Sequence, residues 1–215
     1  MDLIYLFLLV PFFIYWCVNE KAGLQIGITV LLCIWSVLIY RHFKEDISLD
    51  IDLTWVIVAF LFCIDLFLGK RINFLLSKGG VRAYMITAAV VSFLMILYHP
   101  SVEYVFPGGI LLGLSIGYYV NKRYIGFKSV DTLRIKGIKK WLIMAARFIL
   151  GVAVLAVIIF RVNQIMINIS NNIYILIYGF LCYAVMGLWV SVAAPWVFIK
   201  IHLAGTDDST GNNDK

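Results

Sequence analysis

Long apolar blocks that lack charged residues recur along the whole chain of 215 residues, and they restrict the fold more than any other feature. A helix needs about 20 apolar residues to cross the hydrocarbon core of a bilayer. Hydrophobic residues make up 63% of the chain and charged residues only 14%, a composition far from that of a soluble domain. The sequence therefore predicts an all-α fold, a polytopic transmembrane helical bundle.

The positions of the apolar blocks predict about seven spans. They are Leu3–Val18, Leu24–Tyr40, Leu53–Gly69, Ala83–Tyr98, Phe106–Val120, Trp141–Phe160 and Ile173–Ile199. We expect these spans to form one transmembrane domain over residues 1–204, followed by a disordered polar tail at 205–215. A cleaved signal peptide is the alternative for the first block, but Asp2 is its only early charge and no basic region precedes it.

Basic residues gather in two predicted connections that are separated by two spans, so both connections face the same side of the membrane. The third connection contains Lys70, Arg71, Lys78 and Arg82, and the fifth contains Lys122, Arg123, Lys128, Arg134, Lys136, Lys139 and Lys140. The positive-inside rule assigns this side to the cytoplasm, which places the N-terminus outside and the C-terminus in the cytoplasm. We thus expect a multi-pass protein of a cell membrane, with a bacterial inner membrane as the favoured location.

The net charge of +6 is explained by this topology, and we expect no nucleic-acid partner. The bilayer itself is the expected partner. The fifth connection alternates basic and apolar residues, so it is either a topology determinant alone or a short segment that also rests on anionic headgroups.

Two ionisable side chains, Asp65 and Arg147, lie within predicted spans. Such residues are rare because an unpaired charge in hydrocarbon is costly. At a rise of 1.5 Å per residue, both lie about 7–9 Å deep from the predicted cytoplasmic side. We expect an intramembrane charge pair between them, or contacts of each with backbone carbonyls or water. The alternative is that Arg147 extends its guanidinium to the interface.

Small residues mark close helix contacts in membranes, and the fifth predicted span contains them at every fourth position, in Gly109, Gly113 and Gly117. This spacing places the three glycines on one helix face. The sequence predicts a helix-packing groove there, which takes either a neighbouring helix or an acyl chain.

Three segments are similar to parts of a known family. The opening LFLLVPFFIYWCVNEKAGLQIGITVLL has a Tyr-Trp-Cys-Val run before a short charged turn and a glycine, and GGILLGLSIGYYVNKRYIGF precedes a basic linker and a further helix. The third segment is GLWVSVAAPWVFIKIHLA. Together they resemble the type-2 phosphatidic acid phosphatase (lipid phosphate phosphatase) superfamily, especially bacterial members with a C-terminal membrane extension.

The catalytic motifs of that superfamily are largely absent from this chain. The family uses a lysine and arginine before a proline, a Pro-Ser-Gly-His turn, and a Ser-Arg, five residues, His, three residues, Asp pattern. Only the third has a counterpart, and its residues are Ser92, Phe93, His99 and Glu103. Phe93 stands where the family has a phosphate-binding arginine, and phenylalanine has no donors for phosphate. Glu103 stands where it has aspartate.

His99 and Glu103 are nevertheless the candidate catalytic residues, on the predicted outer side, because the resemblance gives a histidine at this position the role of nucleophile. The other interpretation is that His99 is an interfacial residue at a helix end. Dispersed histidines and the absence of phosphate-loop and zinc motifs lead us to expect no metal and no organic cofactor.

The resemblance implies a degenerate, non-catalytic lipid phosphatase-like protein, a pseudoenzyme. It would bind a phospholipid or polyprenyl phosphate, or act as a scaffold for a membrane protein partner. One alternative is a divergent membrane lipid phosphate or diphosphate phosphatase that uses His99 with Glu103. The other is a small transporter or channel subunit, in which Asp65 and Arg147 would form the coupling pair.

Overall fold

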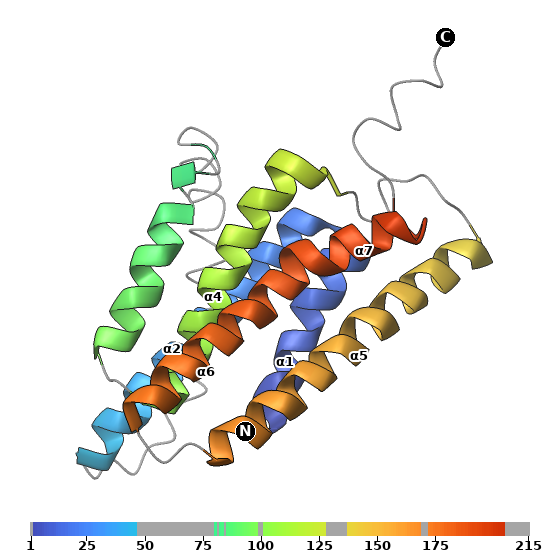
Figure 1. The fold of residues 1–215 in the computed structure, drawn as a ribbon. Helices are drawn as coiled ribbons and strands as arrows, with labels where there is room; N and C mark the ends of the chain where they lie inside the picture. The colour runs from blue at the N-terminus through green and yellow to red at the C-terminus, as the bar shows by residue number, and fades with distance from the viewer. Residues whose placement is uncertain are drawn as a thin grey trace.

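The structure is a computed structural model that describes residues 2–46, 80, 82–83, 85–98, 101–127, 137–168 and 172–204 (Figure 1). Every element of these ranges is a helix or a helical turn. They are α1 (Asp2–Phe13), η1 (Ile14–Val18), α2 (Glu20–Asp46), the helix Met85–Tyr98, α4 (Val102–Val120), η2 (Asn121–Ile125), α5 (Ile138–Asn168), α6 (Asn172–Leu188), η4 (Trp189–Ala193) and α7 (Ala194–Lys200). The predicted all-α fold is therefore confirmed for the described residues.

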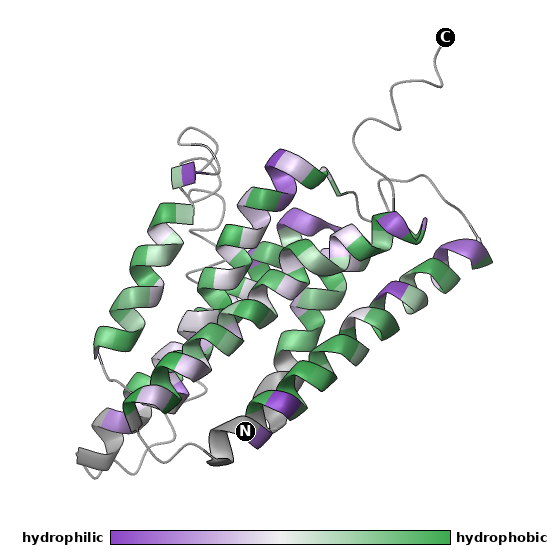
Figure 2. Ribbon diagram, in the orientation of Figure 1, coloured by the Kyte–Doolittle hydropathy of each residue, from purple (hydrophilic) through white to green (hydrophobic). Residues whose placement is uncertain are grey.

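Three described stretches are long and apolar enough to cross a membrane: Glu20–Tyr40, Ile138–Val162 and Ile173–Lys200. Two shorter apolar helices, Leu8–Val18 and Met85–Tyr98, accompany them. Apolar residues make up much of every helix (Figure 2), and many large ones, such as Leu97, Ile138 and Trp141, are exposed on the outside of the bundle. A protein with this surface is a membrane protein, because water would not tolerate such an apolar exterior.

Several helices extend beyond the predicted spans. α5 continues through Arg161 to Asn168, where the sequence predicted a connecting loop, and α2 continues to Asp46. A helix does not have to end where the hydrocarbon ends, because polar side chains outside the hydrocarbon do not interrupt its backbone hydrogen bonds. The predicted span Leu53–Gly69 and the predicted tail 205–215 lie outside the described residues.

The helices run along one another, and the start of α1 and the end of α7 lie at opposite ends of the bundle (Figure 1). α4 and α6 lie side by side along most of their length. The core between the helices is formed by large side chains such as Trp16, Leu111 and Phe198, which are 0–2% exposed.

The contact between α4 and α6 depends on the three glycines of α4. A Cβ atom on Gly109 would lie 2.7 Å from the Cβ of Tyr183, and one on Gly113 would collide with the backbone oxygen of Ala184. A Cβ on Gly117 would collide with the hydroxyl of Ser191. The face formed by these glycines thus lies against α6 and η4, close enough that backbone meets backbone.

Replacing Gly113 with alanine should destabilise the protein by about 1–3 kcal/mol, because the added methyl overpacks a contact with backbone atoms that cannot move aside cheaply. The measurement is the thermal midpoint of the purified protein in detergent. Gly27→Ala is the matched control, since a Cβ there would meet Pro11 at an ordinary 3.6 Å. Equal midpoints for the two variants would contradict this account of the α4 and α6 contact.

Candidate functional site

Pro195 and the π-helical turn before it leave backbone carbonyls of η4 without helical donors. In η4 the N–H of Ala194 bonds the carbonyl of Trp189, five residues earlier. The next residue, Pro195, has no N–H and therefore cannot bond to the carbonyl of Val190 or of Ser191. A buried carbonyl needs another donor, so two acceptors are available at this point of the fold.

Two aromatic side chains from η1 supply the donors. The indole Nε1 of Trp16 donates to the carbonyl oxygen of Val190 at 2.8 Å, and the hydroxyl of Tyr15 donates to the carbonyl oxygen of Ser191 at 3.3 Å. Both side chains are buried, with exposures of 0% for Trp16 and 1% for Tyr15. These two hydrogen bonds thereby join η1, near the start of the described chain, to η4, near its end.

Asn121 connects another π-helical turn, η2, to the hydroxyl of Tyr15. Its Nδ2 donates to the hydroxyl oxygen of Tyr15 at 2.9 Å, and its Oδ1 accepts the backbone N–H of Phe127 at 3.3 Å. Gly126 makes this return possible because its φ of 62° lies in the left-handed region that glycine adopts without strain. The hydroxyl of Tyr15 therefore links η1, η2 and η4.

Arg147 on α5 completes the arrangement and is 0% exposed. Its Nη1 donates to the carbonyl oxygen of Trp16 at 2.8 Å, while its Nε and Nη2 donate to that of Leu203 at 3.0 and 2.5 Å. The carbonyl of Trp16 belongs to η1, and that of Leu203 belongs to the turn that follows α7. The guanidinium also lies 5.3 Å from the ring centre of Phe127 and 6.0 Å from that of Phe198.

We call this cluster, formed by Tyr15, Trp16, Asn121, Arg147 and Ser191, the polar junction. It lies at the end of the bundle that carries the basic residues of η2, where Lys122 forms an ion pair with Glu20 at 3.7 Å. Gly151, one turn after Arg147, gives the ring of Trp16 room to reach α5, since a Cβ there would collide with the ring. All five side chains of the polar junction are buried, so its role is structural. It holds η1, η2, η4 and α5 together.

The structure thus places one member of the expected charge pair. Arg147 is in contact with backbone carbonyls, which is one of the two arrangements expected from the sequence. Asp65 lies outside the described residues, and its pairing with Arg147 stays a prediction.

The candidate catalytic residues are not brought together by described contacts. Glu103 is exposed at the start of α4, and His99 lies outside the described residues. Ser92 is buried and bonds its own helix through the carbonyl of Ala88, whereas the neighbouring Phe93 is 58% exposed. Ser92 and Phe93 therefore face different directions on the helix Met85–Tyr98. Among the described residues, no group of three His, Cys, Asp or Glu side chains could hold a metal ion.

Sequence reasoning identified Arg147 as important but missed the other residues of the polar junction. Tyr15, Trp16, Asn121 and Ser191 have ordinary positions in apolar or turn-like segments, and no spacing rule joins residues from three distant segments. One signal was present: each of these four residues lies within a segment on which the family resemblance rests. Pro195, late in a predicted span, was the second signal, because a proline there frees carbonyls for outside donors.

Comparison with protein families gives one match, in which residues 105–206 fit the model described as the transmembrane extension of PAP2 superfamily phosphatases. Comparison with curated proteins and with solved structures gave no significant match. The matched region begins in α4 and runs to the end of the described chain, so it contains Asn121, Arg147 and Ser191 of the polar junction. The match over residues 105–206 confirms the predicted resemblance to the PAP2 phosphatase superfamily.

Proposed function

We propose that this protein is a non-catalytic relative of the PAP2 phosphatases, and that it acts by binding a lipid phosphate or a membrane partner instead of hydrolysing a phosphate ester. The proposal builds on the match to the transmembrane extension and on the surroundings of the one catalytic motif that has a counterpart in the sequence.

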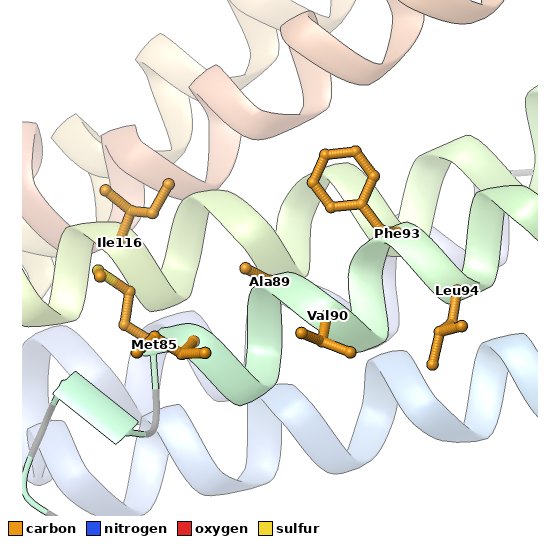
Figure 3. Close-up of a pocket in the computed structure, with 7 residues that line it drawn as sticks. Met85, Ala89, Val90, Phe93, Leu94 and Ile116 are labelled. Atoms are coloured by element: carbon orange, nitrogen blue, oxygen red, sulfur yellow. The ribbon is translucent and has the colours of Figure 1, made fainter.

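The position of Phe93 is the observation that carries the proposal. Phe93 occupies the place of a phosphate-binding arginine in that motif, and in the structure its ring lines an apolar groove with Ala89 and Ile116 (Figure 3). An apolar groove offers no donors to a transferring phosphoryl group, whose charge an enzyme must stabilise electrostatically. Glu103, the other candidate catalytic residue, is exposed and belongs to α4, so it is not part of the helix Met85–Tyr98 that carries Phe93.

The surroundings of Arg147 disfavour the transport alternative. A coupling residue of a transporter would lie in a water-accessible cavity or at a broken helix near the midplane. Arg147 is instead packed between two aromatic rings and bonded to two carbonyls, with no exposed surface. This is the closed contact of a structural residue.

The decisive test is phosphate release from lipid phosphates and polyprenyl diphosphates by the purified full chain in detergent. We expect release no higher than that of a buffer blank, and equal values for the wild type, His99→Ala and Glu103→Ala. A catalytically active PAP2 phosphatase in the same detergent serves as positive control. Release that is lost in His99→Ala, from a variant that stays folded and monodisperse, would overturn the proposal and establish a divergent phosphatase.

We further propose that the chain crosses a bacterial inner membrane seven times, with its N-terminus outside and the basic end of the bundle in the cytoplasm. The clustering of basic residues at one end supports this orientation. A cysteine-free background with single cysteines at Glu103 or Lys139 tests it, since the two positions belong to opposite ends. In intact cells an impermeant maleimide should label the cysteine at 103 and not that at 139. The reverse pattern, or equal labelling of both, would contradict the orientation.

A further inference from the structure

Two arginines, Arg82 and Arg123, lie near the phenol of Tyr119. Arg123 donates from Nη1 to the hydroxyl oxygen of Tyr119 at 3.0 Å, and Arg82 lies near the same hydroxyl. Arg82 precedes the helix Met85–Tyr98, whereas Tyr119 and Arg123 belong to the end of α4 and to η2. We call Arg82 and Arg123 the arginine pair. Two distant segments thus place two positive charges around one phenol.

The arginine pair has no carboxylate partner among the described residues. The charged and polar neighbours of Arg123 there are the phenols of Tyr119 and Tyr124. The adjacent Lys122 is different, because it forms an ion pair with Glu20. Both arginines are exposed, so their remaining N–H donors are accessible from outside the bundle. Guanidinium groups in such a setting suit an oxyanion with several acceptor oxygens, above all a phosphate.

The apolar groove lies between the helix Met85–Tyr98 and α4, the same region of the fold as this pair. It has a volume of about 570 Å³ and is lined by Met85, Ile86, Ala89, Val90, Phe93, Leu94 and Ile116 (Figure 3). Met85 follows Arg82 by three residues, and Ile116 precedes Tyr119 by three on one face of α4. The arginine pair therefore lies close in sequence to the Met85 and Ile116 end of the groove.

The dimensions fit one leaflet of a bilayer. From Met85 to Leu94 the helix rises about 14 Å at 1.5 Å per residue, and half of the hydrocarbon core of a bilayer is about 15 Å thick. A phosphate held by the arginine pair would then lie at headgroup level while a chain in the groove extends towards the midplane. Charge complementarity selects this occupant, since an apolar helix of a partner protein would leave the arginine pair unpaired.

We infer that the arginine pair and the apolar groove together bind one anionic glycerophospholipid, with the phosphate on Arg82 and Arg123 and an acyl chain between the helix Met85–Tyr98 and α4. This inference rests on the proposed function, because it names the ligand and the place of lipid-phosphate binding. The phenol of Tyr119, beside the arginine pair, lies about 24 Å along α4 from Glu103 at 1.5 Å per residue.

The test is native mass spectrometry of the full chain in detergent with phosphatidic acid and phosphatidylcholine of identical acyl chains. The wild type should retain phosphatidic acid at least tenfold more strongly than phosphatidylcholine, and Arg82→Gln with Arg123→Gln should lose about tenfold of that retention, as expected for removing charge-assisted hydrogen bonds. Lys139→Gln with Lys140→Gln is the matched control, since it removes two charges at the same end of the bundle and should bind like the wild type.

A second arm tests the groove. Ala89→Trp should fill the groove and reduce phosphatidic acid retention with the arginine pair intact, and water-soluble glycerol 3-phosphate at the same concentration should not displace the lipid. Equal retention by the arginine variant and the lysine variant would overturn the inference, as would displacement by glycerol 3-phosphate. These outcomes do not depend on phosphate release, so hydrolysis through His99 would overturn the proposed function and leave this site intact.

Discussion

The buried guanidinium of Arg147 is the interaction on which the arrangement of this bundle depends. A positive charge without exposed surface is tolerated only when hydrogen-bond acceptors surround it. Arg147 obtains them near the two ends of the described chain, from the carbonyls of Trp16 in η1 and of Leu203 beyond α7. The two rings beside the guanidinium, Phe127 and Phe198, exclude water and add cation–π attraction.

The rest of the polar junction also depends on side chains that bond to backbone carbonyls, here carbonyls without helical donors. A π-helical turn followed by Pro195 creates acceptors at Val190 and Ser191, and the side chains of Trp16 and Tyr15 occupy them. The N-terminal hairpin is in this way bonded to the region that matches the PAP2 transmembrane extension. In this chain the matched region packs against the helices before it, and α4 lies beside the helix Met85–Tyr98, where Gly108 approaches Ser92. The proposed lipid site lies on these two helices.

The sequence predicted the features that depend on local pattern. Apolar blocks gave the helical class and the approximate bounds of the described spans, and the spacing of Gly109, Gly113 and Gly117 identified the face that lies against α6 and η4. Arg147 was identified because a charged residue within a membrane span is costly to bury. The partners of Arg147 were not predictable, because carbonyl acceptors are present at every residue and only the fold selects those of Trp16 and Leu203. Helix ends such as that of α5 were also missed, because hydropathy reports the hydrocarbon boundary and not the last helical hydrogen bond.

The role of Arg147 is tested most directly by the thermal midpoint of unfolding of Arg147→Gln in detergent. The matched comparison is Arg161→Gln, on the exposed face of the same helix. The account predicts a lower midpoint for Arg147→Gln, which corresponds to a loss of about 2–4 kcal/mol in the free energy of unfolding. The shorter, uncharged amide cannot reach both carbonyls and leaves buried acceptors unpaired. Arg161→Gln should stay within about 0.5 kcal/mol of the wild type, as exposed substitutions usually do. Equal midpoints for the two variants would contradict the claim that Arg147 holds the polar junction together.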